Sequence, residues 1–148
     1  MELMFLRLLQ TCSFTGGSYC SDCHVDDESL IPARVFYNGD FSRRRICQSV
    51  NRFLNRIQAD PILDATQFSR SVYKMQRQLG SVLVLRTRLH HLAAYLDTCR
   101  SSDAGAQLRK RIWPREYLFE KLHFYALTDL LQVNPILGYP LEYRNGTA

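Results

Sequence analysis

The sequence predicts an all-α fold, a bundle of four to five helices with a loop-rich N-terminal segment. Two observations lead to this fold class. Beyond residue 42, apolar residues recur three and four positions apart, which is the spacing of one face of an α-helix. The connections between these stretches are short, and short connections favour antiparallel neighbours. We expect a loop-rich segment over 1–41, the bundle over 42–134 and an irregular tail over 135–148.

The length and composition fit a single globular domain. The chain has 148 residues, of which 46% are hydrophobic and 22% are charged. A chain of this length can bury enough surface to form a core without disulfides or metals. No apolar run is long enough to span a bilayer, so we expect no membrane span.

The N-terminal third is rich in residues that form turns. Residues 11–42 contain glycines, a proline, several serines and an acidic run, which together indicate loop. Ala33 to Tyr37 could form one short strand, with Asn38-Gly39 as the turn behind it. No second alternating run follows, so we expect no sheet. Met1 to Gln10 is expected to form a short helix.

The first long helix is expected to begin behind Ser42. This residue is a natural N-cap, because its hydroxyl can accept a hydrogen bond from an unpaired amide of the first turn. The helix then carries one apolar stripe, formed by Ile46, Val50, Phe53, Leu54 and Ile57. Asp60-Pro61 ends this helix and can begin the next one.

Two further helices are expected between residues 61 and 100. The second has the apolar residues Phe68, Val72, Met75 and Leu79, and Gly80 is its expected stop. The third has the most regular spacing in the chain, formed by Val82, Leu85, Leu89, Leu92, Leu96 and Cys99. Because one glycine costs a helix only about 1 kcal/mol relative to alanine, a single long helix over 61–100 is the alternative.

The last helix is expected over Arg115 to Val133, after a turn of helix over 106–112. It is apolar on nearly all sides, so it is either buried or covered by a partner. We expect the core to contain twelve residues of these helices: Val50, Phe53, Leu54, Ile57, Phe68, Val72, Leu85, Leu89, Leu92, Leu96, Leu122 and Leu130.

Positive charge, almost all of it arginine, lies opposite the apolar stripes. The formal net charge is +5. Arg43, Arg44 and Arg45 open the first long helix, and Arg45, Arg52 and Arg56 share one of its sides. A second row contains Arg70, Lys74 and Arg77. If the two rows align, they form a cationic surface suited to phosphate, which predicts nucleic acid as a possible partner. The alternative is that these residues only solvate the helix faces.

The cysteines suggest a metal site. Cys12, Cys20 and Cys23, with His24 or Cys47, supply four candidate zinc ligands, because a structural zinc site needs four nitrogen or sulfur donors. Cys20 to His24 also matches the attachment pattern of c-type haem, which we disfavour because no export signal is present. The remaining alternative is that the cysteines are ordinary reduced side chains that bind no cofactor.

The sequence contains no catalytic motif, so we do not expect an enzyme. The leading prediction is a non-enzymatic protein–protein interaction module, a small regulatory or adaptor subunit that binds a protein partner or a second copy of itself. Its expected binding surface is the apolar face formed by Leu85, Leu89, Leu92 and Leu96. Basic nucleic-acid-binding and zinc-stabilised domains are the alternatives. The odd number of cysteines and the lack of a signal-peptide core predict an intracellular protein, cytoplasmic or nuclear.

Overall fold

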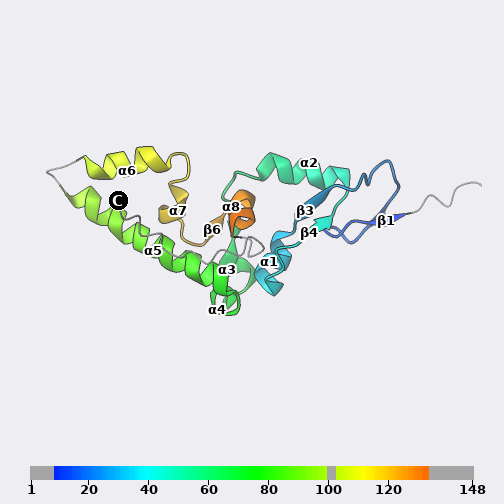
Figure 1. The fold of residues 1–148 in the computed structure, drawn as a ribbon, viewed down its shortest axis with the longest axis horizontal. Helices are drawn as coiled ribbons and strands as arrows, with labels where there is room; N and C mark the ends of the chain where they lie inside the picture. Colours follow the sequence, from blue (N-terminus) through cyan, green and yellow to red (C-terminus); the bar gives the residue numbers. More distant parts are fainter. Residues whose placement is uncertain (1–8, 100–102, 134–148) are drawn as a thin grey trace, which may run out of the picture.

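The computed structural model describes residues 9–99 and 103–133, in which helices dominate without forming a plain bundle (Figure 1). The helices are α1 (Pro32–Asn38), α2 (Gln48–Ile57), α3 (Ala65–Phe68), α4 (Val72–Met75), α5 (Arg77–Thr98), α6 (Ala104–Ile112), α7 (Tyr117–Glu120) and α8 (Leu127–Gln132). The strands are β1 (Gln10–Thr11), β2 (Ser18–Tyr19), β3 (Glu28–Leu30), β4 (Arg43–Arg45), β5 (Leu63–Asp64) and β6 (Phe124–Tyr125). The prediction of an all-α bundle is therefore wrong.

The strands form three small antiparallel sheets, which corrects the expectation of no sheet. β1 pairs with β2, β3 with β4, and β5 with β6. The last pair joins segments that are distant in the sequence, since Leu63 lies opposite Tyr125. Strands of two or three residues are too short to show an alternating pattern, so they leave no recognisable signal in the sequence.

The elements form an elongated molecule with three regions (Figure 1). α5 and α6 lie side by side as an arm at one end, and they are in contact with each other. α1, α3 and α8 lie in the middle, and α2 lies with β1, β3 and β4 at the other end. None of the described helices is both long enough and apolar enough to cross a membrane.

Residues 33–37, predicted as a strand, form most of α1 instead. Pro32 occupies the start of this helix, where its missing N–H costs no hydrogen bond, and Gly39 ends it with a φ of 65°. The Gly39 amide donates to the carbonyl oxygen of Val35 at 2.9 Å. Val35 and Phe36 both enter the core, whereas a strand would direct them to opposite faces.

The segment before α2 is extended, so Ser42 does not cap a helix. The Ser42 amide donates to the Asp40 carboxylate at 3.0 Å, and the arginines that follow form β4. Cys47 is the residue that precedes α2. The extended form is favoured here because β3 supplies partners for the backbone amides and carbonyls of β4.

The predicted second helix is divided among β5, α3, α4 and the start of α5. The Asp64 carboxylate caps α3 by accepting a hydrogen bond from the Thr66 amide at 2.9 Å. Gly80 lies inside α5 and does not stop a helix. A Cβ atom on Gly80 would lie 2.7 Å from the carbonyl oxygen of Tyr73, so glycine allows α4 to pack against α5. The alternative of one helix over 61–100 is also wrong.

The long helix α5 buries a stripe that is offset from the predicted one. Its buried residues are Leu79, Arg86 and Ala93, which lie seven positions apart. Leu85 and Leu92, which we expected in the core, are both 49% exposed. The offset arises because Arg86, a charged residue, occupies the middle of the buried stripe.

The guanidinium group of Arg86 holds the chain from α7 to β6 against α5. It donates hydrogen bonds to three backbone carbonyl oxygens, those of Leu118 at 2.8 Å, Leu122 at 3.2 Å and Phe124 at 2.9 Å. It also lies 4.5 Å from the centre of the Tyr125 ring, within the range of a cation–π interaction. The predicted last helix over 115–133 is instead divided into α7, β6 and α8. The contacts with Arg86 replace intrahelical hydrogen bonds at this interruption.

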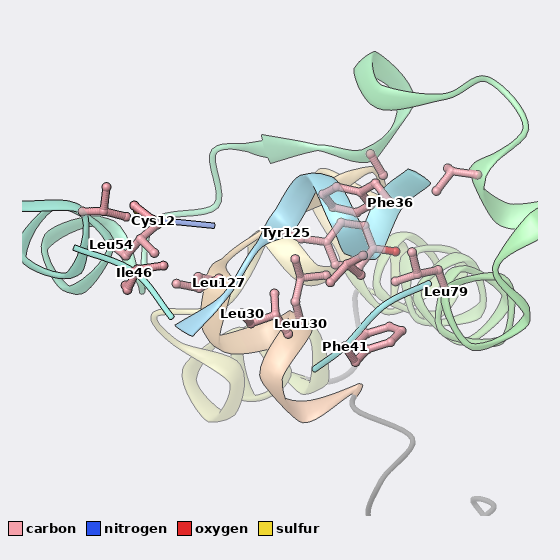
Figure 2. Close-up of a cluster of buried hydrophobic side chains, with 14 of the residues drawn as sticks. Cys12, Leu30, Phe36, Phe41, Ile46, Leu54, Leu79, Tyr125, Leu127 and Leu130 are labelled. Atoms are coloured by element: carbon pink, nitrogen blue, oxygen red, sulfur yellow. The ribbon is translucent and has the colours of Figure 1, made fainter. Parts of the chain in front are cut away.

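The core is one cluster that extends from α2 to the start of α5 (Figure 2). Figure 2 shows Cys12, Ile46 and Leu54 near α2, and Phe36 with Tyr125 on the side toward α5. Of the twelve predicted core residues, four are buried: Val50, Leu54, Val72 and Leu130. Five are half-buried: Ile57, Phe68, Leu89, Leu96 and Leu122. Three are exposed: Phe53, Leu85 and Leu92.

The ends of the chain are only partly covered by the structure. Residues 1–8 of the predicted N-terminal helix and the predicted tail over 135–148 lie outside the described residues, and Gln10 belongs to β1. The helix predicted over 106–112 is confirmed as part of α6.

Candidate protein-interaction site

An apolar groove of about 270 Å³ lies beside α2. We call it the α2 groove. Its walls come from α1, α2, α3, α8 and the segments before β2 and around β5. The lining residues are Phe14, Ile31, Pro32, Ala33, Phe53, Leu54, Ile57, Ile62, Leu63, Phe68 and Leu127.

The groove is assembled by contacts between distant segments. The Thr128 amide, at the start of α8, donates to the carbonyl oxygen of Gln58 at the end of α2, at 3.0 Å. The pairing of β5 with β6 then holds Leu63 beside α8. The ring of Phe68 stacks on Phe36 with 4.7 Å between centroids, which fixes α3 against α1. The groove is therefore held by the core.

Three large apolar side chains of the groove remain accessible to solvent. Phe14 is 39% exposed, Phe53 is 50% exposed and Ile62 is 54% exposed. They come from three separate segments and line one groove. Exposed apolar residues that gather in this way mark binding sites more often than residues that are scattered singly.

The charge beside the groove is positive on the α2 side. Arg52 and Arg56 are exposed and follow one edge of α2, next in sequence to Phe53 and Ile57. Among the described residues, neither arginine has a carboxylate partner; Arg52 donates only to the Gln48 side chain at 2.6 Å. A carboxylate brought by another molecule could therefore pair with them.

The charge near β5 is negative. Asp60 is exposed, and Asp64 accepts hydrogen bonds from the side chain and the amide of Thr66, which lower its pKa. Two acidic residues thus flank Ile62 and Leu63 of the α2 groove in the sequence.

A second groove of about 260 Å³ lies between α5 and α8, and we call it the α5 groove. It contains two of the four residues predicted to bind a partner, Leu85 and Leu89. The other two, Leu92 and Leu96, do not line it. An ion pair crosses this region, with 2.6 Å between Arg115 and the buried Asp129, so the α5 groove is more polar than the α2 groove.

The structure does not bring the predicted arginine rows together. Arg43, Arg44 and Arg45 lie on β4, Arg52 and Arg56 on α2, and Arg70, Lys74 and Arg77 between α3 and the start of α5. Figure 1 places α2 and α4 on opposite sides of the middle region. Part of the first row is also neutralised, since Arg44 lies 2.9 Å from Asp40 and Arg45 lies 3.6 Å from Asp26.

The predicted zinc ligands occupy different environments. Cys12 is buried, and its sulfur accepts a hydrogen bond from the Cys47 amide at 3.3 Å. Burial raises the pKa of the Cys12 thiol, but this bond and others bring it down to about 7. His24 is 1% exposed, and neither ring nitrogen has a partner among the described residues. Among the described residues, no three His, Cys, Asp or Glu side chains are placed to hold a metal ion. Zinc at Cys12, Cys20, Cys23 and His24 stays a prediction.

Sequence reasoning missed the groove because its residues carry no common pattern. Phe53 and Ile57 were predicted as core, since their spacing is that of a buried stripe. Phe14 and Ile62 lie outside helices and strands, where periodicity gives no signal.

Comparison with known proteins identifies the family. A family model described as the Rubicon Homology Domain matches residues 10–138. Pleckstrin homology domain-containing family M member 3 of Homo sapiens is 41% identical over 139 residues, which cover 90% of this chain and 18% of that protein. Protein associated with UVRAG as autophagy enhancer of Homo sapiens is 28% identical over 141 residues, covering 95% of this chain and 21% of that protein.

A relative from Drosophila melanogaster, Differentially expressed in FDCP 8 homolog, is 31% identical over 126 residues, covering 82% of this chain and 25% of that protein. The chain thus spans between 18% and 25% of the length of these three relatives. The family model covers most of the chain, and its match includes every element from β1 to α8. The chain therefore belongs to the Rubicon homology domain family.

Proposed function

We propose that this chain is a protein-interaction domain of a non-enzymatic regulatory or adaptor protein that acts in autophagy. The observation that carries the proposal is membership of the Rubicon homology domain family. One relative is named for association with another protein and for enhancing autophagy. The proposal carries that role over to the present chain, and it places the protein inside the cell.

The α2 groove supports an interaction role. It combines accessible apolar side chains with a rigid support from the core, which are the features of a protein-binding pocket. The nucleic-acid alternative receives no comparable support, because its arginines are divided between two sides of the molecule. We therefore do not propose nucleic acid as a partner.

The test is autophagic flux in cells that lack the protein. The cells are complemented either with the full-length protein or with the same protein lacking residues 9–133, expressed at matched levels. We expect the intact protein to restore the turnover of an autophagosome marker and the deletion to fail. Equal restoration by both proteins would overturn the proposal.

A further inference from the structure

We propose that the α2 groove binds an acidic amphipathic helix of a partner protein, whose apolar side chains enter the groove while its carboxylates pair with Arg52 and Arg56. This inference rests on the proposed function and names the chemistry of the partner. Two features support it: the apolar lining of the groove and the positive charge of Arg52 and Arg56 on α2.

The spacing of apolar residues on α2 suits a partner helix. Phe53 and Ile57 are four residues apart, so they form one row along the helix and both line the groove. A partner helix presents its own apolar residues three and four positions apart, and these can fill a groove formed by such a row. Phe14 and Ile62 would then contact the partner from the other walls of the groove.

The same helix carries a second row, which is positively charged. Arg52 and Arg56 are also four residues apart, so they lie in a row beside the apolar one. The chain from Phe41 to Ala59 contains no Asp or Glu. Within the described residues these two arginines have no ion-pair partner, so an incoming carboxylate meets no competitor on α2.

Charge also sets the orientation of the partner. Asp60 and Asp64 flank the groove residues Ile62 and Leu63 in the sequence, and they would repel acidic partner residues that come near them. We therefore expect the carboxylates of the partner to lie along α2, beside Arg52 and Arg56. A partner with acidic residues on both sides of its apolar row should bind less tightly than one with acid on a single side.

The experiment uses the full 148-residue chain and two labelled helical peptides. Both peptides carry the same leucine row, and glutamates flank one side of it in the first peptide while lysines replace them in the second. Fluorescence anisotropy measures binding at low and at physiological salt. We expect the acidic peptide to bind, with affinity that falls as salt rises, and the basic peptide to bind at least about tenfold more weakly.

Variants locate the binding site. Phe53→Ala should weaken binding of the acidic peptide at least about tenfold, because it removes an apolar anchor. Leu85→Ala is the matched control, since Leu85 is 49% exposed and lines the α5 groove, while Phe53 is 50% exposed. Should Phe53→Ala fail to fold, Ile62→Ser supplies the same test from an exposed residue outside any helix or strand. The double variant R52E/R56E should reverse the preference toward the basic peptide.

Several results would overturn the inference. Equal loss in Phe53→Ala and Leu85→Ala would remove the α2 groove as the site, and equal binding of both peptides would remove the acidic requirement. If the chain binds vesicles of anionic lipid but neither peptide, the ligand of the α2 groove is a membrane surface and not a protein helix. If sedimentation shows a dimer and Phe53→Ala dissociates it, the occupant of the α2 groove is a second copy of this chain. If the peptides fail while autophagic flux still requires residues 9–133, the inference falls and the proposed function stands.

Discussion

Arg86 joins α5 to the chain from α7 to β6 through its buried side chain. Its side chain is 4% exposed, and it donates to three backbone carbonyl oxygens. A charge at this depth is tolerated because the carbonyl groups and the ring of Tyr125 replace the water it has lost. Removing the guanidinium group would take these donors from three partly buried carbonyls.

Arg86→Met should therefore lower the free energy of unfolding by about 3 kcal/mol, since it keeps the apolar stem and removes all three hydrogen bonds. Urea unfolding followed by circular dichroism measures the change. Arg88→Met is the control, because Arg88 is exposed on the same helix and should cost less than about 0.5 kcal/mol. Equal losses in the two variants would show that the buried hydrogen bonds contribute nothing.

Asp40 supports the turn between α1 and β4 through its charge. Hydrogen bonds from the side chain and the amide of Ser42, with a further one from Arg44, lower the pKa of the Asp40 carboxyl from 3.8 to about 2. Because the folded state lowers this pKa, the stability it contributes is present above about pH 4 and is lost as the pH falls toward 2.

Asp40→Asn should cost about 1 kcal/mol at neutral pH, a value reduced by solvent screening of the exposed Arg44. The difference between the variant and the natural chain should shrink as the pH is lowered from 4 to 2. Unfolding curves over this pH range measure it. A difference that stays constant would assign the effect of Asn to packing.

At the scale of elements, the sequence predicts long helices better than short ones. Residues 82–98 of the predicted third helix are confirmed within α5, which ends before Cys99, and the stripe of α2 has its buried side at Val50 and Leu54. α3, α4 and α7 have four residues each and are held by contacts such as the Asp64 cap. A helix of one turn has little stability of its own, so tertiary partners that no local pattern records decide where it forms.

The candidate site was predictable only in part for the same reason. The apolar row of Phe53 and Ile57 is visible in the sequence, but its exposure depends on what packs opposite it. Phe14, Ile62 and Leu127 reach the groove through strand pairs and turns. The offset of the buried stripe in α5 has a different cause, since a periodicity argument assigns Arg86 to solvent.

Gly80→Ala provides a test at the scale of two helices. Glycine to alanine inside a helix normally stabilises it by about 1 kcal/mol. Here the new Cβ would lie 2.7 Å from the Tyr73 carbonyl oxygen, so α4 must shift. We therefore expect a net destabilisation of about 1 to 2 kcal/mol in urea unfolding. Ser81→Ala, at the next and exposed position, is the control, and stabilisation by Gly80→Ala would contradict the close approach.

At the scale of the whole molecule, the arm and the core differ in how they are held. No residue of α6 belongs to the core cluster, and Gly105 is the only buried residue of that helix. α2, of similar length, buries Val50 and Leu54. The arm is held partly by the half-buried Arg109, which lies 2.6 Å from both Asp97 and Glu120.

The backbone amides of α6 should therefore exchange their hydrogens at least about tenfold faster than those of α2. Hydrogen exchange measured by mass spectrometry checks this difference. Arg109→Ala should speed exchange in α6 further while leaving α2 unchanged. Equal protection of the two helices would mean that the arm opens only when the whole domain unfolds.

The pairing of β5 with β6 also sets an order of events during protein synthesis. Leu63 and Leu127 line the same groove, yet the second is made long after the first. A ribosome releases the chain from its N-terminus, so a nascent chain that has emerged only as far as α6 lacks one wall of the α2 groove. Capture of a partner there must follow translation of α8. A product that terminates early would carry the arginines of α2 without a finished pocket, and it could not compete with the complete protein.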